Sequence, residues 1–334
     1  MRLAVVGAGY WGPNLVRNLL TIPDVSVIVC ERDPKRLLQV KERFPSVEVT
    51  SDYDAVLGDT SIAGVLLATP ISTHGPLGVR ALGAGKHLFV EKPLAGSVSD
   101  AEALVTEAER RGRVLMVGHT FEYSPPIVKI RDVIERGELG PIYFISMTRV
   151  NLGLHQRDAS VIWDLAPHDF SILFHWLQEG PKRVTAIGRA CVQPGIPDVA
   201  FVSLEFPSGV VANVEVAWLA PSKIRKTTIV GQKKMLAYDD TQNIEAVKIY
   251  DQGVDFRDPE TFGEYQLSYR TGDIVSPRIS GAEPLKVEMS HFVECIQGNK
   301  TPRSDGRSGL RVVRALEAAE RSLRSRAPVE IESR

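Results

Sequence analysis

The chain has 334 residues, which is enough for two domains with well-formed cores. Hydrophobic residues make up 43% of the sequence and charged residues 24%, as in ordinary soluble globular proteins. The formal net charge of −1 gives no support for nucleic acid or an acidic membrane as a partner. The three cysteines are widely spaced, so neither a disulfide framework nor a metal site is expected. No apolar run reaches membrane-spanning length, and the chain starts on a core strand where a signal peptide would lie, so we expect a cytoplasmic protein.

The first stretch predicts a strand, a glycine-rich turn and a helix. The apolar run Leu3–Val6 leads into GAGYWG at residues 7–12, and a helical pattern follows. Gly7 allows the tight turn out of the strand, Gly9 lets the backbone approach a pyrophosphate, and Gly12 lets the helix pack close to the strand. The N–H groups at the helix start would hold the phosphates. This pattern predicts a dinucleotide site.

An acidic residue at the end of the second predicted strand supports that reading. The apolar run Val25–Cys30 ends in Glu31, about 20 residues past the last glycine, where a carboxylate would hold a ribose diol. Such a carboxylate repels a 2′-phosphate and favours NAD, whereas the neighbouring Arg32 could accept the phosphate of NADP or stack on adenine. We expect NAD, with NADP as the alternative. A structural strand–helix–strand unit without a cofactor is the other alternative.

The rest of the first part alternates short apolar runs with helical stretches, which is typical of a parallel sheet covered by helices. The further predicted strands are Gly64–Ala68, His87–Val90 and Val114–Val117, with a short edge strand at Val47–Val49. The predicted helices are Leu15–Leu20, Pro34–Arg43, His74–Ala84 and Ser99–Arg110, the last capped by Ser99-Asp100. Ligands of such sheets bind outside the carboxyl ends of the strands. Those ends carry Thr69-Pro70, Glu91-Lys92-Pro93 and Gly118-His119.

The pattern changes after about Phe121. One helix, Ile127–Arg136, is followed mainly by strand-like alternation, with a hairpin signal at Ser208-Gly209 and one helix near Pro167–Gln178. The predicted strands are Ile142–Val150, Val184–Arg189, Val199–Phe206, Val210–Trp218, Lys226–Val230, Met235–Asp239 and Glu245–Tyr250. They predict a second domain with a mostly antiparallel sheet. Residues 256–280 show no period and are expected to be loop-rich; helices Pro284–Gln297 and Ser308–Ser325 close the chain.

Three side chains have the chemistry for proton and oxyanion handling. Lys92 stands at the end of a predicted parallel strand, and Pro93 restricts its backbone to extended geometry. Asp164 and His168 are spaced four apart, so they share one helix face, with Pro167 tolerated in a first turn. The alternatives are a surface lysine, an N-cap aspartate and an interior histidine.

The combination of GAGYWG, ATPISTHGPLGVRALGAGKHLFVEKPLA and WDLAPHDFSILFHWL resembles the Gfo/Idh/MocA oxidoreductases over essentially the whole chain. The resemblance implies an α/β fold with an N-terminal Rossmann domain (1–120). It also implies a second, α+β domain (121–334) with an open, mainly antiparallel sheet, and a closing helix that packs back on the first. It implies a bound nicotinamide dinucleotide, homodimers or homotetramers formed through the open sheet face, and Lys92, Asp164 and His168 as catalytic residues.

In this interpretation His168 is the base for a hydroxyl proton, Asp164 orients it, and Lys92 stabilises the developing alkoxide. The cofactor-binding residues are expected to be Gly7, Gly9, Tyr10, Trp11, Gly12, Glu31, Arg32, Thr69, Pro70, His74, Glu91, Lys92 and His119. His74 could instead serve only as a helix-start residue. Besides the trio, the substrate contacts are expected from Tyr123, Arg149, Asn151 and Arg157; the two arginines could also be plain surface residues.

The expected reaction is hydride transfer between nicotinamide and a secondary alcohol or ketone of a sugar, polyol or nucleotide-sugar. Two alternatives stay open. One is an NAD-dependent glycosidase that oxidises a sugar carbon transiently, and the other is a dinucleotide-binding sensor without catalysis. The fold alone does not separate these functions.

Overall fold

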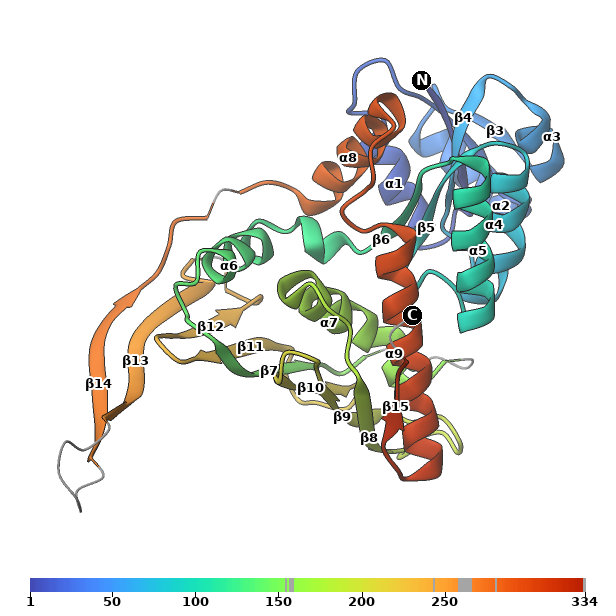
Figure 1. The fold of residues 1–334 in the computed structure, drawn as a ribbon. Helices are drawn as coiled ribbons and strands as arrows, with labels where there is room; N and C mark the ends of the chain where they lie inside the picture. Colours follow the sequence, from blue (N-terminus) through green and yellow to red (C-terminus); the bar gives the residue numbers. More distant parts are fainter. Residues whose placement is uncertain (154, 156–158, 243, 258–265, 280, 333–334) are drawn as a thin grey trace. The chain divides into compact units, whose positions relative to one another are not determined.

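The computed structural model describes the chain except residues 154, 156–158, 243, 258–265, 280 and 333–334 (Figure 1). The described residues form two compact units, one of residues 1–124 and 282–314 and the other of residues 125–281 and 315–334. The chain passes between the units three times, and the third passage falls inside helix α9 (Gly306–Ser325), which contributes to both units. The first unit therefore includes a segment from near the C-terminus.

The first unit is a Rossmann fold, as predicted. Its parallel sheet has the order β3-β2-β1-β4-β5-β6, with strands Arg2–Val6, Ser26–Cys30, Glu48–Thr50, Ile62–Leu67, His87–Glu91 and Leu115–Gly118 numbered β1 to β6 along the chain. The helices are α1 (Gly12–Leu19), α2 (Pro34–Arg43), α3 (Tyr53–Gly58), α4 (His74–Gly83), α5 (Val98–Arg111) and α8 (Pro284–Gly298), with 3₁₀ turns η1 (Ile71–Thr73) and η2 (Thr120–Tyr123). Helix α8 packs with α1 over a core that includes Leu3, Leu15, Phe89 and Phe292.

Local signals explain most of these helix ends. Asp33 caps α2 by accepting a hydrogen bond from Lys35 N, and Gly112 ends α5 in the left-handed conformation. The predicted cap Ser99-Asp100 is wrong, because α5 begins at Val98 and its N-cap is Ser97, whose hydroxyl accepts from Asp100 N.

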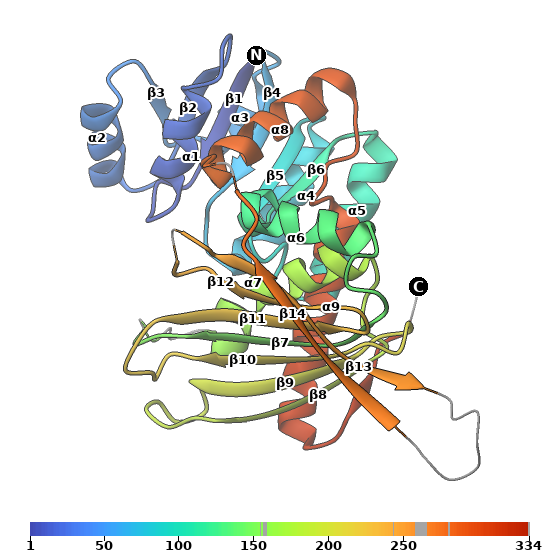
Figure 2. The ribbon, with the colours of Figure 1, turned by 90° about the vertical axis from the view of Figure 1, so that its left-hand side faces the viewer.

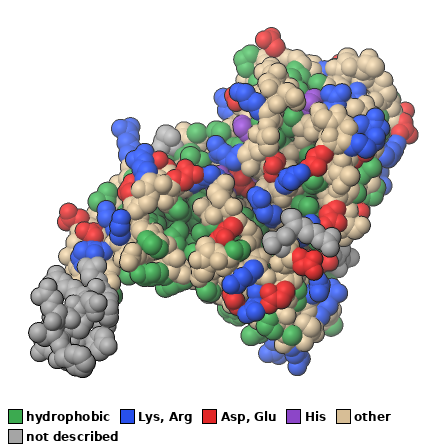
Figure 3. Space-filling model, in the orientation of Figure 1, with side chains coloured by type: hydrophobic (Ala, Val, Ile, Leu, Met, Phe, Trp, Pro, Cys, Tyr) green, Lys and Arg blue, Asp and Glu red, His purple; other side chains and the backbone are tan. Residues whose placement is uncertain are grey.

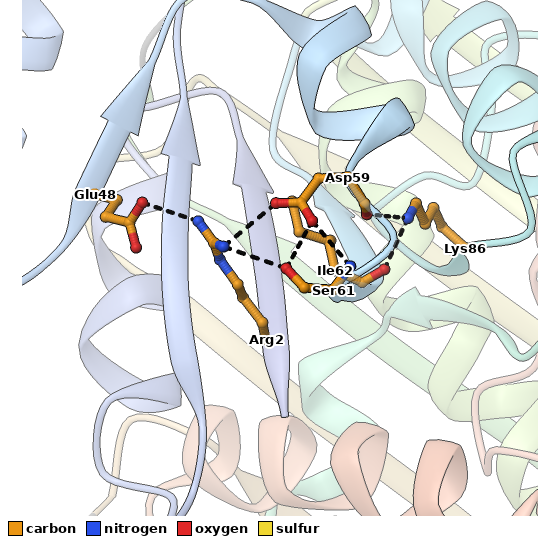
Figure 4. A network of polar contacts seen from close by, with 6 residues as sticks. All are labelled: Arg2, Glu48, Asp59, Ser61, Ile62 and Lys86. Atoms are coloured by element: carbon orange, nitrogen blue, oxygen red, sulfur yellow. Dashed lines mark hydrogen bonds and ion pairs between the residues drawn. The ribbon is translucent and has the colours of Figure 1, made fainter.

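The end of the first sheet opposite the glycine turn is held by a network of polar contacts, of which only those of Lys86 are buried (Figure 4). Arg2 pairs with Glu48 at 2.9 Å and with Asp59 at 3.3 Å. The buried Lys86 amine donates to the carbonyls of Asp59, at 2.6 Å, and Ile62, at 2.9 Å. The Lys86 contacts satisfy backbone carbonyls at the amino end of β4. The candidate site lies at the opposite, carboxyl ends of the strands.

The second unit is built on a nine-stranded sheet with the order β14-β13-β12-β11-β7-β10-β9-β8-β15 (Figures 1 and 2). Its strands β7 to β15 are Ile142–Val150, Arg183–Arg189, Val199–Glu205, Val211–Ala217, Ile224–Gly231, Met235–Asp239, Val247–Arg257, Gln266–Val275 and Val329–Glu330. Neighbouring strands are antiparallel except β7 and β10, so the predicted mostly antiparallel sheet is confirmed. The predicted Ser208-Gly209 hairpin joins β9 to β10, with Gly209 at φ +90°.

Helix α7 (Val161–Leu177) covers one face of this sheet, beside α6 (Pro125–Glu135). Two predictions fail here. Helix α7 starts six residues before Pro167, so this proline lies inside the helix rather than in its first turn. The loop-rich prediction for residues 256–280 is wrong for the described part, because β14 pairs with β13 in a long hairpin. The described side chains of β14 are exposed or half-buried on both faces of the strand. Its sequence therefore lacks the alternation of apolar and polar residues that predicts a strand.

Charge is mixed over the molecule. On the face drawn in Figure 3, lysine and arginine side chains are interspersed with aspartate and glutamate and form no continuous basic area. No helix among the described residues is long and apolar enough to cross a membrane.

Candidate active site

The turn between β1 and α1 has room for glycine only at Gly7 and Gly12. Gly7 has φ +95°, and a Cβ built on it would lie 2.5 Å from the Ala68 carbonyl oxygen. A Cβ on Gly12 would lie 2.0 Å from the Gly7 carbonyl oxygen, so α1 can start this close to the strand only with glycine. At Gly9 the nearest side-chain atom to such a Cβ is Arg36 Nη1, at 3.6 Å. The backbone at Gly9 is therefore accessible to a phosphate, as the fingerprint requires.

Glu31 is fixed at the carboxyl end of β2. It is 8% exposed, and its Oε2 accepts from Ala8 N at 2.8 Å while Oε1 accepts from Asp33 N at 3.1 Å. Arg36 Nη1 lies 3.8 Å from Glu31 Oε2, whereas Arg32 is exposed. The turn and this carboxylate fit the pyrophosphate and the ribose of a dinucleotide. The sequence analysis missed Arg36, whose only signal is its position one helical turn after Asp33.

His74 joins two segments of the site from within the core. Its Nδ1 lies 2.9 Å from the Pro93 carbonyl oxygen and its Nε2 lies 2.9 Å from the Thr69 carbonyl oxygen. The ring is 1% exposed, and burial lowers the pKa of His74 against the opposing effect of the two carbonyls. Because both nitrogens are engaged by backbone, we reassign His74 from cofactor contact to support of the segments after β4 and β5. Pro70 precedes η1 in the first of these segments.

Several ionisable groups are enclosed around Lys92 in the first unit. Glu91 Oε2 accepts from Lys92 N at 3.3 Å, and burial raises the pKa of Glu91 to about 7 against the attraction of the Lys92 ammonium. His119 is 1% exposed, and burial together with Lys92 lowers its pKa to about 3, so it is neutral at physiological pH. Among the described residues, Glu91 Oε1 and both His119 ring nitrogens have no hydrogen-bond partner.

Glu288, on α8, belongs to the same group and was missed. It is fully buried, and its Oε2 accepts from Thr120 Oγ1 at 2.7 Å. Burial, and next the charge of Glu91, raise the pKa of Glu288 well above its ordinary value. The signal in the sequence is a glutamate one turn after Leu285 on a helix face that continues with Met289 and Phe292, where an apolar residue is expected.

Tyr123 does not match its prediction as a substrate contact. It is 2% exposed, and its hydroxyl lies 3.0 Å from Ser304 Oγ. The Arg303 guanidinium stacks over its ring at 4.9 Å. Tyr123 is therefore a packing residue of the first unit, where it ties η2 to the segment before α9.

In the second unit, Asp164 and His168 lie one turn apart on α7, both half-buried. Ser160 stands at the N-cap position, so the alternative that Asp164 caps the helix is wrong. The Trp218 indole Nε1–H donates to Asp164 Oδ2 at 2.9 Å. This contact fixes the carboxylate on the helix face that also carries His168.

Arg149 is committed to structure rather than to substrate. Its Nε and Nη2 donate to the two carboxylate oxygens of Asp169 at 2.7 and 3.0 Å, and both residues are buried. The prediction that Arg149 binds substrate is therefore wrong. The two guanidinium nitrogens that would hold a carboxylate or phosphate of the substrate already bind Asp169. Asn151 is half-buried next to β10, and its N–H donates to the Ala217 carbonyl at 3.2 Å. Arg157 lies outside the described residues.

The structure thus distributes the predicted residues over both units. Lys92, the glycine turn, Glu31, Thr69, Glu91 and His119 stand at the carboxyl edge of the first sheet, with Tyr10 and Trp11 in the turn. Asp164 and His168 stand on α7 of the second unit. No group of three or more His, Cys, Asp or Glu side chains arranged for a metal ion occurs in the described part of the chain.

Family profiles match both parts of the sequence. The description "Oxidoreductase family, NAD-binding Rossmann fold" covers residues 1–119, and "GFO/IDH/MocA C-terminal domain" covers residues 127–237. The chain belongs to the Gfo/Idh/MocA family of oxidoreductases. Its first unit is an NAD-binding Rossmann domain, and the chain is an enzyme of the dehydrogenase type.

Named relatives of this Gfo/Idh/MocA protein act on different alcohols. The chain is 27% identical over 315 residues to scyllo-inositol 2-dehydrogenase (NAD(+)) of Bacillus subtilis, covering 90% of this chain and 88% of that protein. It is 26% identical over 319 residues to UDP-N-acetylglucosamine 3-dehydrogenase of Acidithiobacillus ferrooxidans, covering 94% and 95%. A crystal structure of the latter enzyme superimposes with a TM-score of 0.81 at 25% identity over 97% of this chain and 98% of that one.

Among solved structures, GenD2 from gentamicin A biosynthesis, in complex with NAD, has the same fold, with a TM-score of 0.83 at 24% identity over 100% of this chain and 97% of that one.

Proposed function

We propose that this enzyme transfers a hydride between NAD and a secondary alcohol or ketone of a sugar, polyol or nucleotide-sugar. The proposal is supported by a lysine that directly follows β5, in the unit that carries the glycine turn, and by Asp164 and His168 one turn apart on α7 of the other unit. A Rossmann domain with a site lysine and a histidine–carboxylate pair suits alcohol oxidation, because the reaction needs a base and an oxyanion stabiliser.

The residues have separate tasks in this proposal. NAD supplies the hydride acceptor when it is bound. His168 takes the hydroxyl proton, and its ordinary pKa near neutrality suits a base that must also return the proton in ketone reduction. Asp164 orients the imidazole, and the Lys92 ammonium donates to the reacting oxygen as negative charge develops on it. Glu31 favours NAD over NADP, because a carboxylate held at the ribose repels a 2′-phosphate.

The test is to incubate protein stripped of bound cofactor with NAD or NADP and a panel of inositols, sugars and nucleotide-sugars, and to follow absorbance of reduced nicotinamide. One reactive substrate class with NAD supports the proposal. Lys92→Met and His168→Asn should each lower kcat by about 10²–10⁴, and His168→Asn should change NAD affinity little. Near-normal turnover in either variant would contradict the assigned roles. Silence across the panel with firm NAD binding, followed by sugar release from aryl glycosides, would instead support the glycosidase alternative.

We further propose that the enzyme is a homo-oligomer that pairs through the sheet face opposite α7. Phe144 lies across from Val211 on this face, and Ile187 lies across from Phe201; all four side chains are exposed. A sheet face with several large exposed apolar side chains is typical of a protein interface. Light scattering should show a dimer or tetramer, and Phe201→Glu with Val211→Glu should shift the mass to that of the 36.7 kDa monomer.

A further inference from the structure

Trp218 follows β10 directly and contacts a proposed catalytic residue from 54 positions away. Its indole is 1% exposed, and its only polar atom, Nε1–H, donates to Asp164 Oδ2 at 2.9 Å. This hydrogen bond restricts the orientation of the carboxylate that it reaches. Trp218 therefore helps to hold the Asp164 carboxylate in place on α7.

The backbone at Trp218 also binds the segment that leads out of β7. Gly153 N donates to the Trp218 carbonyl at 2.9 Å, and Asn151 N donates to the Ala217 carbonyl at 3.2 Å. Gly153 lies so close to the ring that a Cβ built on it would be 2.9 Å from Trp218 Cδ1. The His155 ring is tilted against the indole, with ring centroids 5.3 Å apart.

Trp218 itself is well anchored. Its backbone N–H donates to the Asp198 carbonyl at 2.9 Å, and the Asp198 carboxylate is fully buried and accepts from the N–H groups of Cys191 and Val192. These bonds hold the backbone that carries the indole, and the indole packs against Gly153, so we expect a displacement at Gly153 to reach its Nε1–H edge. The ring connects two segments that are far apart in the sequence.

We propose that Trp218 is a positioning residue that couples the segment 151–153 to Asp164, and through Asp164 to the proton transfer at His168. The inference rests on the proposed function and adds two residues to it, Trp218 and Gly153. Asn151 belongs to the segment for which substrate contacts are predicted, so a substrate that binds there acts on the same element that orients the carboxylate. In this proposal Gly153 affects kcat through the Trp218 indole, against which it packs.

The test is a double-mutant cycle on kcat between Trp218→Phe and Asp164→Ala. Phenylalanine keeps most of the ring packing and removes the N–H, so Trp218→Phe should lower kcat about 10- to 100-fold with little change in NAD affinity. In the Asp164→Ala background the same change should lower kcat less than about twofold, because the group through which Trp218 acts is already gone.

Two matched controls separate positioning from general loss of stability. Trp176 is also buried, and its Nε1–H donates to the Ile127 carbonyl at 3.1 Å, so Trp176→Phe removes a similar bond away from Asp164. We expect it to lower the unfolding temperature but leave kcat within about twofold. Gly153→Ala should lower kcat several-fold, with no further effect in Asp164→Ala, because the new Cβ displaces the indole. Gly281→Ala, where nothing lies within 4 Å of the new Cβ, should change nothing.

The outcomes are distinct. Independent, multiplicative effects of Trp218→Phe and Asp164→Ala in an active enzyme would overturn the coupling, as would a Trp176→Phe variant as slow as Trp218→Phe. A wild-type enzyme that oxidises no alcohol, or an Asp164→Ala variant with full kcat, would overturn the proposed function and this inference with it.

Discussion

Replacing Glu91 by glutamine should stabilise the protein at alkaline pH while it impairs the site. Burial raises the pKa of this carboxyl from 4.5 to about 7, so the folded state holds the proton more tightly than the unfolded state does. The stability contributed by the proton is therefore complete below pH 4.5 and is lost as the pH rises through 7. At about 1.36 kcal/mol per pH unit, the full loss is roughly 3 kcal/mol, of which about 2.5 kcal/mol falls between pH 5 and pH 8.

The assay is urea unfolding of the wild type and Glu91→Gln at pH 5, 6, 7 and 8. The difference in unfolding free energy should move in favour of the variant by about 2.5 kcal/mol across this range, since glutamine keeps the shape and does not ionise. Glu42→Gln, an exposed glutamate on α2, is the control and should track the wild type at every pH. A difference between wild type and Glu91→Gln that stays constant from pH 5 to pH 8 would refute the reasoning.

Three further substitutions test other parts of the structure. Gly7→Ala forces a left-handed backbone position on alanine and drives its Cβ to 2.5 Å from the Ala68 carbonyl, so NAD affinity, followed by fluorescence titration, should fall more than tenfold or the fold should be lost. Lys86→Met leaves two loop carbonyls without their donor and should cost about 2 kcal/mol in urea unfolding. Arg149→Met leaves the buried Asp169 carboxylate without its guanidinium partner and should lower the free energy of unfolding by about 3–5 kcal/mol. Replacing both partners by apolar residues should lower it less.

The Rossmann half could be predicted because its signals are local. The glycine turn, Glu31 and the segment around Lys92 each follow a short apolar run that forms a strand, and the parallel arrangement brings the strand ends to one edge. Gly7 and Gly12 are needed for contacts within the turn or with its neighbouring strand, so the sequence reports them directly. The antiparallel character of the second sheet was equally visible from period-2 alternation.

The remainder depends on contacts between distant residues that no local pattern reports. The Trp218–Asp164 bond spans 54 positions and the Thr120–Glu288 bond spans 168. Arg149 resembled a substrate ligand because its partner Asp169 lies on another element, and a buried ion pair has no sequence period. Strand β14 was missed because it pairs on one side only and exposes both faces, which removes the apolar alternation.

The polar groups around Lys92 lower the stability of the folded protein, and we infer that they are present because the site needs them. Each buried polar atom without a partner costs about 1–3 kcal/mol, and Glu91 Oε1, Glu288 Oε1 and both nitrogens of His119 have none among the described residues. Packing alone would favour apolar residues at these positions. Their pKa directions also agree with one another, since His119 is neutral at physiological pH and the two carboxyls are raised towards neutrality or beyond. The net charge beside Lys92 thus depends on Glu91, whose pKa is raised to about 7, so in the proposed reaction the protonation of this carboxyl would alter the field at Lys92.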